Sequence, residues 1–345
     1  MTAASTVERC RAGRGAMVNS GVLLAAVAGL AGVALLSLRI GSVSLSTTEV
    51  ITAFTNFEGT NAHLIVRSLR LPRTIIGIGV GAALAVAGVT AQAVTRNALA
   101  SPGVLGINSG AAFGVVTAVF VLGIASPSGY LWFAFAGALG AVIVVFAIAS
   151  AGLGGVTPVK LALAGVVLTA LLSAWISFVL IFDQRTLDEV RFWLAGSLAG
   201  RDLGVFMQVL PFLAIGLVIG LAMGRTLNAV SLGEDVAAGL GLNVALVRAV
   251  ATVVVVLLAG AGVAAAGPIG FVGLAVPHMA RLMVGADHRW LLPVSAVAGP
   301  TLLLAADVIG RVIARPSEIQ VGIVTAIIGG PVLIHLVRSR KLAEL

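Results

Sequence analysis

The chain has 345 residues, of which 59% are hydrophobic and only 10% are charged. A soluble domain carries about 25% charged residues, so the composition excludes an ordinary soluble protein and indicates that lipid surrounds most of the surface. The net charge of +8 comes almost entirely from arginines that lie singly or in short clusters between apolar runs. That pattern is typical of membrane-flanking charge and excludes a nucleic-acid partner.

Ten apolar stretches are long enough to cross the hydrocarbon core, which takes about 20 residues, except that the eighth is short. They cover residues 18–38, 74–95, 104–124, 131–151, 159–182, 204–224, 248–267, 269–284, 291–310 and 319–337. Gly267 and Pro268 separate the seventh from the eighth, because proline lacks an N–H and glycine weakens a helix. The sequence therefore predicts an all-α, polytopic integral membrane protein with about ten transmembrane helices in one domain, 1–345.

The first apolar stretch follows Arg9, Arg11 and Arg14, so it also fits a signal peptide. It is long enough to span, and no small-residue cleavage site stands out at its end, which favours a retained first helix. Ten spans place both termini on one side of the membrane. The positive-inside rule weakly favours cytoplasmic termini, with twelve Lys and Arg residues inside and nine outside.

This orientation assigns each polar segment to a side. The tails 1–17 and 338–345 and the segment 225–247 are expected to be cytoplasmic. The segment 39–73, with a short amphipathic helix near 47–55, is expected outside, as is the segment 183–203. Ala87–Ala91 echoes Ala261–Ala265 in a span of opposite direction, which predicts inverted repeats, although two Ala/Gly-rich segments match this well by chance.

The membrane interior offers little chemistry. Between Arg96 and Lys160 the sequence has no carboxylate, histidine, lysine or arginine, whereas proton- or ion-coupled carriers place carboxylates or histidines at mid-membrane. Asp307 is the best candidate, and Arg311 four residues later predicts a neutralising ion pair on one helix face. Neither lysine follows a glycine, so no P-loop exists, and any ATP hydrolysis belongs to a partner. The four histidines lack metal-ligand spacing, and no cofactor is expected.

Two polar clusters are candidates for docking. Ser231 and Glu234 fit a capping box at the start of a short helix that Gly239–Gly241 ends. This segment is either a knob for a soluble partner or an ordinary loop. Arg67, Arg70 and Arg73 recur every three residues before the second span, where they either pair with lipid phosphates or receive an acidic partner.

Many short motifs resemble those of permease subunits of the FecCD type, which belong to binding-protein-dependent ABC importers for iron–siderophores, haem and cobalamin. The likeness runs from about residue 20 to residue 340. It rests on Arg70–Arg73, Gln92, Arg96–Gly103, Leu105–Gly106, Gly110–Ala111, Leu163–Gly165, Gly233–Glu234, Gly239–Gly241, Gly270–Arg281, Gly285, Asp287–Arg289, Asp307, Arg311, Glu318, Val321–Gly322 and Gly329–Pro331. Members usually have proline where this chain has Ala98, which puts the local gate geometry in doubt.

The resemblance implies a transport subunit rather than an enzyme. It implies ten spans in the cytoplasmic (inner) membrane, a second permease subunit (a copy or a paralogue), two ATPase subunits inside and a substrate-binding protein outside. A ferric siderophore is the expected cargo, with haem and cobalamin as alternatives. A stand-alone secondary carrier and a membrane scaffold are the rivals from other classes.

The resemblance also assigns residues by position. Arg70, Arg73 and Arg311 would meet glutamates of the binding protein. Asn97 and Leu99 match a position near the inner gate, and Thr157 lies close to a second gate region. The segment 231–242 would be the coupling helix seated in the ATPase, through Ser231, Leu232, Gly233, Glu234, Asp235, Ala238, Gly239, Leu240 and Gly241.

Overall fold

A computed structural model describes residues 3–151 and 157–338, and the secondary structure of those residues is entirely helical. The helices in chain order are α1 (Ala3–Arg39), α2 (Thr47–Thr55), α3 (Asn61–Leu64), η1 (Ile65–Arg70), α4 (Leu71–Thr95), η2 (Pro102–Leu105), α5 (Ile107–Leu122), α6 (Pro127–Ser150), α7 (Pro158–Phe182), α8 (Gln184–Leu194), α9 (Leu203–Ala222), α10 (Gly224–Ser231), α11 (Glu234–Gly239), α12 (Val244–Ala266), α13 (Val272–Val284), α14 (His288–Ile313) and α15 (Val321–Arg338). The prediction of an all-α protein is confirmed.

The ten predicted spans correspond to ten apolar helices. Seven are long enough to cross a membrane, and three are shorter, namely Ile107–Leu122, Val272–Val284 and Val321–Ile334. The amphipathic helix expected near 47–55 is α2, which begins with a capping box between Ser46 and Glu49. The predicted N-terminal tail is largely a continuation of α1, and residues 339–345 of the predicted C-terminal tail lie outside the described part.

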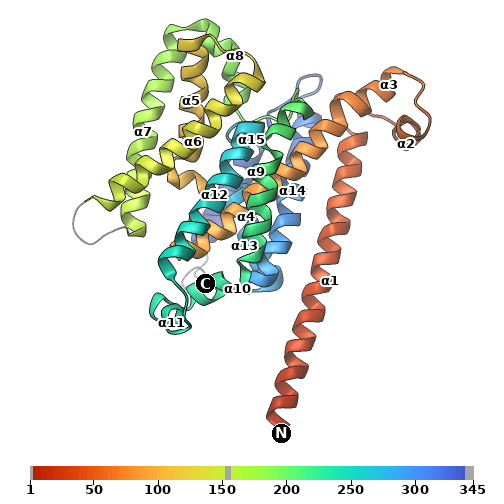
Figure 1. The fold of residues 1–345 in the computed structure, drawn as a ribbon. Coiled ribbons are helices and arrows are strands. Elements are labelled where there is room, and N and C mark those ends of the chain that lie inside the picture. The colour runs from red at the N-terminus through yellow and green to blue at the C-terminus, as the bar shows by residue number, and fades with distance from the viewer. Residues whose placement is uncertain (1–2, 152–156, 339–345) are drawn as a thin grey trace.

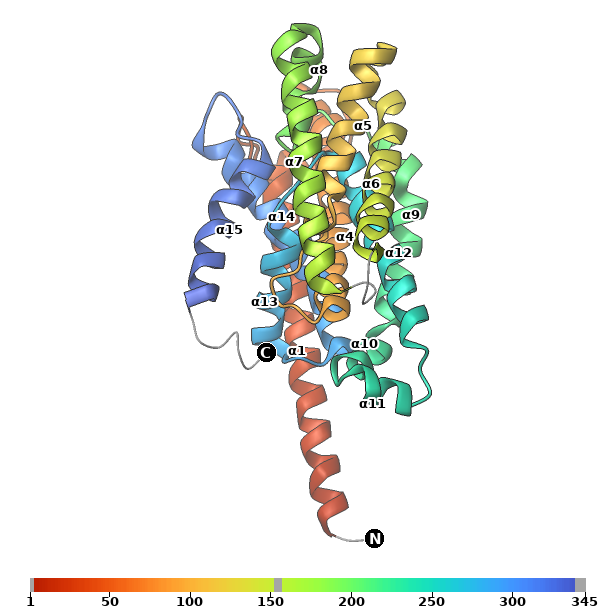
Figure 2. The ribbon, with the colours of Figure 1, turned by 90° about the vertical axis from the view of Figure 1, so that its left-hand side faces the viewer.

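The helices form an elongated bundle with two distinct ends (Figure 1). We call one the α8 end, formed by α2, α3, α8 and the loop 314–320. We call the other the α11 end, formed by α10, α11 and the loop 285–287. Helices α5 to α8 stand together on one side, α4 lies in the centre, and α1 flanks the opposite side and extends beyond the bundle at the α11 end (Figures 1 and 2). Polar segments thus gather at the two ends.

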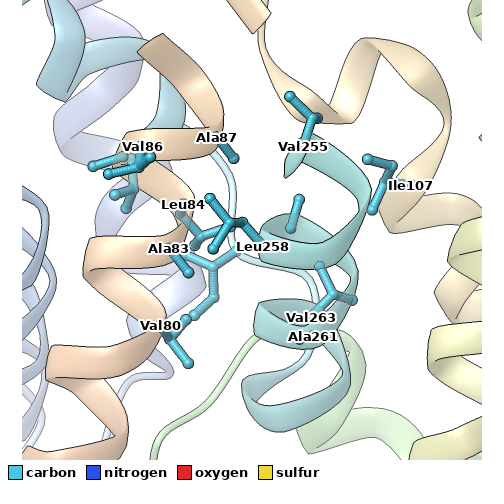
Figure 3. Close-up of a cluster of buried hydrophobic side chains, with 14 of the residues drawn as sticks. Val80, Ala83, Leu84, Val86, Ala87, Ile107, Val255, Leu258, Ala261 and Val263 are labelled. Atoms are coloured by element: carbon cyan, nitrogen blue, oxygen red, sulfur yellow. The ribbon is translucent and has the colours of Figure 1, made fainter. Parts of the chain in front are cut away.

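Helix α4 is the most enclosed span. In its most apolar window 83% of the residues are buried, against 6% for α1 and 17% for α7. Its side chains Val80 and Leu84 belong to the same buried apolar cluster as Val255 and Leu258 of α12 (Figure 3). Because lipid tails are as apolar as these side chains, close packing rather than the hydrophobic effect holds such helices together.

Glycine makes that close packing possible at Gly88. A Cβ built on Gly88 would lie 1.9 Å from the carbonyl oxygen of Gly273 in α13, so only a residue without a side chain fits. Helix α4 also approaches α14 at Gly81, where a Cβ would lie 2.6 Å from the backbone of Pro300. The segments 87–91 and 261–265 belong to the neighbouring helices α4 and α12, and their repeat relationship stays a prediction.

Replacing Gly88 with leucine should separate α4 from α13, since the clash is with backbone and cannot be relieved by a rotamer change. We expect a loss of about 3 kcal/mol or more in the free energy of unfolding, measured by unfolding in mixed micelles. Gly140→Leu in α6 is the matched control, because a Cβ there meets nothing within 4 Å. Equal stability of the two variants would contradict this packing.

Candidate functional site

At the α8 end, Arg70 caps the last turn of α1. A π-helical turn, η1, precedes α4. At the end of this turn, Leu71 N–H donates to the carbonyl of Val66. The next residue, Pro72, has no N–H to donate, so the helical ladder is already interrupted here. Arg70 is 5% exposed, and its guanidinium donates to the carbonyls of Leu38 and Arg39, both at 2.7 Å, and to that of Val43. It thereby satisfies acceptors that a helix end leaves open.

Arg311 reaches the same turn of α1 from α14. Its guanidinium donates to the carbonyls of Ser37 and Ile40, both at 2.9 Å, and to Ser37 Oγ at 2.8 Å. It also pairs with Asp307 at 3.0 Å, one turn earlier on α14. The ion pair predicted from their four-residue spacing is confirmed.

Asp307 has a second cationic partner that the sequence did not indicate. Arg73 of α4 pairs with Asp307 at 2.6 Å, through Nη2 and Nε together, and with Glu318 of the loop 314–320 at 2.7 Å. Asp307 is fully buried and Arg73 nearly so. This arginine cluster (Arg70, Arg73, Arg311, Asp307 and Glu318) holds three positive and two negative charges. It ties α1, α4 and α14 together at the α8 end.

The predicted docking arginines are therefore adjacent, but each is buried and engaged within the chain. Arg67 is the exposed member of the run. Its Nε donates to the carbonyl of Ala53 at 2.6 Å, and its guanidinium lies 4.4 Å from the centre of the Phe57 ring. Contact of Arg70, Arg73 and Arg311 with a partner stays a prediction.

The predicted coupling segment lies at the α11 end and consists of two short helices, α10 and α11. The capping box predicted at Ser231 is wrong: Ser231 is the last residue of α10, and its hydroxyl donates to the carbonyl of Asn228 at 2.7 Å. The N-cap of α11 is Gly233, whose φ of +124° makes the sharp turn and which offers no side chain for capping. The predicted end is confirmed, because α11 stops at Gly239.

The surface of this segment is apolar and exposed. Leu232, Val236 and Leu240 are 68%, 48% and 64% exposed, although they lie between α9 and α12 and belong to none of the apolar spans. Asp235, Ala238 and Gly239 are also exposed, whereas Ala237 is buried against the bundle. The segment thus has an inward face that fixes it and an outward face without a partner among the described residues.

Asn228 links this segment to the start of α14. Its Nδ2 donates to Asp287 at 2.7 Å, and its Oδ1 accepts from His288 N–H at 2.8 Å. Burial raises the pKa of Asp287, but the hydrogen bonds from Asn228 and Arg289 outweigh this effect, and the net direction is downward. The carboxylate therefore stays ionised and keeps α10 attached to α14. Asn228 is not among the residues predicted from the sequence, because it has no sequence signal of its own.

The three predicted gate residues border two adjoining cavities between α4, α6, α7 and α12. Asn97 and Leu99 line one of about 290 Å³, and Thr157 lines the other of about 500 Å³. Both cavities share Phe146 and Thr252 and are mostly apolar. Asn97 is held in a turn in which its Oδ1 accepts from Leu99 N–H at 2.9 Å. Thr157 caps α7 by accepting from Lys160 N–H. The structure brings them together, and their gating role stays a prediction.

The described residues contain no group of three or more His, Cys, Asp or Glu side chains that could hold a metal ion. What the geometry offers is two polar ends, apolar cavities between them and an exposed apolar knob at the α11 end. This arrangement suits the docking of partners at the two ends and the passage of a solute between them.

Comparison with known proteins identifies the family. The profile of the FecCD transport family matches residues 29–339. The chain is 46% identical to the Bacillus subtilis (strain 168) protein named "Probable siderophore transport system permease protein YfiZ", over 86% of this chain and 90% of that protein. It is also 46% identical to the ferric enterobactin transport system permease protein FepD of Escherichia coli (strain K12), over 88% of this chain and 91% of that protein.

A solved structure described as a metal-chelate type ABC transporter in an inward-facing conformation has the same fold. It superposes with a TM-score of 0.80 at 31% identity and covers 93% of this chain and 99% of that chain. The chain belongs to the FecCD transport family, as its motifs led us to expect, and is a multi-pass membrane protein.

Replacing Asp307 with asparagine should leave Arg73 and Arg311 buried without a full counter-charge. Breaking a buried ion pair costs about 3–5 kcal/mol, so we expect a loss of that size in the free energy of unfolding in mixed micelles. Glu318→Gln is the matched control, because Glu318 is 31% exposed and should cost less than about 1 kcal/mol. Similar losses for both variants would refute the central position of Asp307.

Proposed function

We propose that this member of the FecCD family is the membrane-spanning permease subunit of an ABC importer that carries a ferric siderophore into the cytoplasm. The observation that carries the proposal is the near full-length identity of 46% to permease proteins named for siderophore and ferric enterobactin transport. Haem and cobalamin remain the alternative cargoes within the same family. The chain itself supplies walls and docking surfaces, and ATP hydrolysis takes place in separate partners.

The α11 end is proposed to be cytoplasmic, in the cytoplasmic (inner) membrane, with both termini on that side. Helix α1 begins and α15 ends on the side of the α11 end (Figure 2). Two ATPase subunits would bind there, and a substrate-binding protein would bind at the α8 end. A second permease subunit, a copy or a paralogue, would complete the pathway by covering exposed apolar helix faces such as that of α7.

The proposed coupling contact uses the exposed face of α10 and α11. Leu232 and Leu240 present apolar side chains that an ATPase groove can bury. The hydrogen bonds of Asn228 to Asp287 and His288 N–H attach the segment to α14, so a push on α11 reaches a transmembrane helix directly. Alternating access would follow when that displacement opens or closes the cavities lined by Asn97, Leu99 and Thr157.

The binding-protein contact is proposed for the α8 end, where the arginine cluster carries one positive charge in excess. Glutamates on the binding protein would be attracted to Arg70, Arg73 and Arg311. Because the arginines also hold the fold together, reversing their charge would unfold the protein. Glu318 offers a cleaner test, since it neutralises Arg73 from a partly exposed position.

Transport should require the ATPase contact. In proteoliposomes containing the permease with its ATPase and binding protein, we expect ATP-dependent uptake of a ferric siderophore but not of haem or cobalamin. Leu232→Asp together with Leu240→Asp should abolish uptake and ATPase association, because a charge cannot be buried in an apolar groove without a partner. Leu69→Asp, at the α8 end and 60% exposed, should leave ATPase association unchanged.

Several outcomes would overturn this assignment. Uptake by the permease alone, driven by a proton or sodium gradient, would show a secondary carrier. ATPase association that survives the double substitution would move the coupling contact elsewhere. Uptake restricted to haem or cobalamin would keep the permease and change the cargo.

Docking should respond to Glu318→Gln in a direction that a purely structural cluster would not produce. Removing this carboxylate frees the Arg73 guanidinium for an incoming glutamate, so the affinity for the binding protein should rise several-fold and depend more steeply on salt. Titration of the binding protein against the permease in nanodiscs at low and high salt measures both effects. Unchanged affinity at every salt concentration would limit the arginines to holding the helices together.

A further inference from the structure

A polar cavity at the α11 end adjoins the apolar cavity lined by Asn97 and Leu99 and shares these two residues with it. Its volume is about 540 Å³, and it lies between the ends of α4, α10 and α13. Gln92, Arg96, Arg281, Ser231 and His288 are among its lining residues, and none of the lining residues is an aspartate or a glutamate. The charged groups that border the cavity are therefore arginines alone, beside neutral polar and apolar residues.

Two buried donors at this cavity lack a partner. Arg281 Nη2 donates to Gln92 Oε1 at 3.3 Å. Because a guanidinium has donors only, this bond fixes the amide so that its oxygen faces Arg281 and its Nε2 faces away. Gln92 is 3% exposed, yet both its Nε2 and Arg281 Nη1 are buried without a hydrogen-bond partner. Such groups are rare and cost about 1–3 kcal/mol each, so an acceptor that reached them would stabilise this end of the protein.

The charges around the cavity favour an anion as that acceptor. Arg281 makes no ion pair among the described residues, and neither does Arg96, an exposed residue in the left-handed turn that ends α4. Asp287 is close in sequence, but Asn228 and Arg289 already occupy its carboxylate. A guanidinium fork matches phosphate and carboxylate oxygens best. Phosphate presents more acceptor oxygens than a carboxylate does, which suits donors that come from separate helices.

We propose that this cavity binds a phosphate group, held by Arg281, Gln92 and Arg96. The group is either free inorganic phosphate or the headgroup phosphate of an anionic lipid, which offer the same chemistry. The site connects the end of α4 to α13 and borders Ser231 at the end of α10, so its occupation stabilises the α11 end. The proposal is independent of the cargo and of the direction of transport.

The test measures the thermal unfolding midpoint of the full chain in phosphatidylcholine nanodiscs, with inorganic phosphate titrated against chloride at constant ionic strength. Phosphate should raise the midpoint in a saturable manner, as expected for a ligand of the folded state. Arg281→Gln should weaken the apparent affinity about 10- to 100-fold, the effect of losing a charged hydrogen bond. Arg225→Gln, which removes an exposed arginine from the same end, should leave the response intact.

Gln92→Glu provides a second variant that does not rely on weakening the protein. It places a carboxylate beside Arg281, so it should raise the midpoint without phosphate and remove the response to phosphate. If Gln92 only fills space, the buried carboxylate will lower the midpoint and the response will remain, which would contradict the proposal.

Nanodiscs containing phosphatidylglycerol distinguish the two sources. A headgroup source predicts a higher midpoint in these nanodiscs, with no further gain from inorganic phosphate. A free-phosphate source predicts the same response in both lipids. Stabilisation of the wild type by neither anion, or a response that Arg281→Gln leaves unchanged, would overturn the phosphate site.

Discussion

The buried carboxylate of Asp307 is the interaction on which the α8 end depends. Helices in lipid gain little from hiding apolar surface from one another, and an unpaired charge there is expensive. Asp307 neutralises Arg311 on its own helix and Arg73 on α4, which frees the remaining guanidinium donors to cap α1. Helix α1 is otherwise the least buried span and packs mainly on α14, so the polar contacts at its last turn add to that packing and fix its end.

The sequence predicts the local part of this cluster and misses the rest for a physical reason. Asp307 and Arg311 are one helical turn apart, and their pairing follows from helix geometry alone. Arg73 and Asp307 are separated by 234 positions, and only the packing of α4 on α14 brings them together. The carbonyls that Arg70 binds have no sequence signal, since every residue carries one. The spacing of Arg70 and Arg73 suggested an exposed docking site, but the fold buries both side chains and supplies their hydrogen-bond partners.

The spans were predictable because the hydropathy and length of a single segment decide whether it can cross a membrane. The start of α11 in the coupling segment depends instead on one backbone angle. Ser231 and Glu234 have the spacing of a capping box, but Gly233, with its positive φ, is the N-cap, so α11 begins at Glu234, two residues later than a helix capped by Ser231 would. The hydroxyl of Ser231 then bonds backward into α10 instead. The family resemblance, rather than any property of the single residues, led us to Asn97, Leu99 and Thr157. They border adjoining cavities, although Thr157 lies 62 positions after the end of α4 at Thr95.

Helix α4 joins the two polar ends, since it carries Arg73 at one and Gln92 at the other. It is the most buried span, and its glycines bring it into backbone contact with α13 and α14. A helix enclosed in this way cannot tilt without breaking contacts on several sides at once. We infer that α4 is the fixed frame of the subunit. The displacement that the proposed transport requires would then be carried by the helices around α4, of which α7 borders the two apolar cavities.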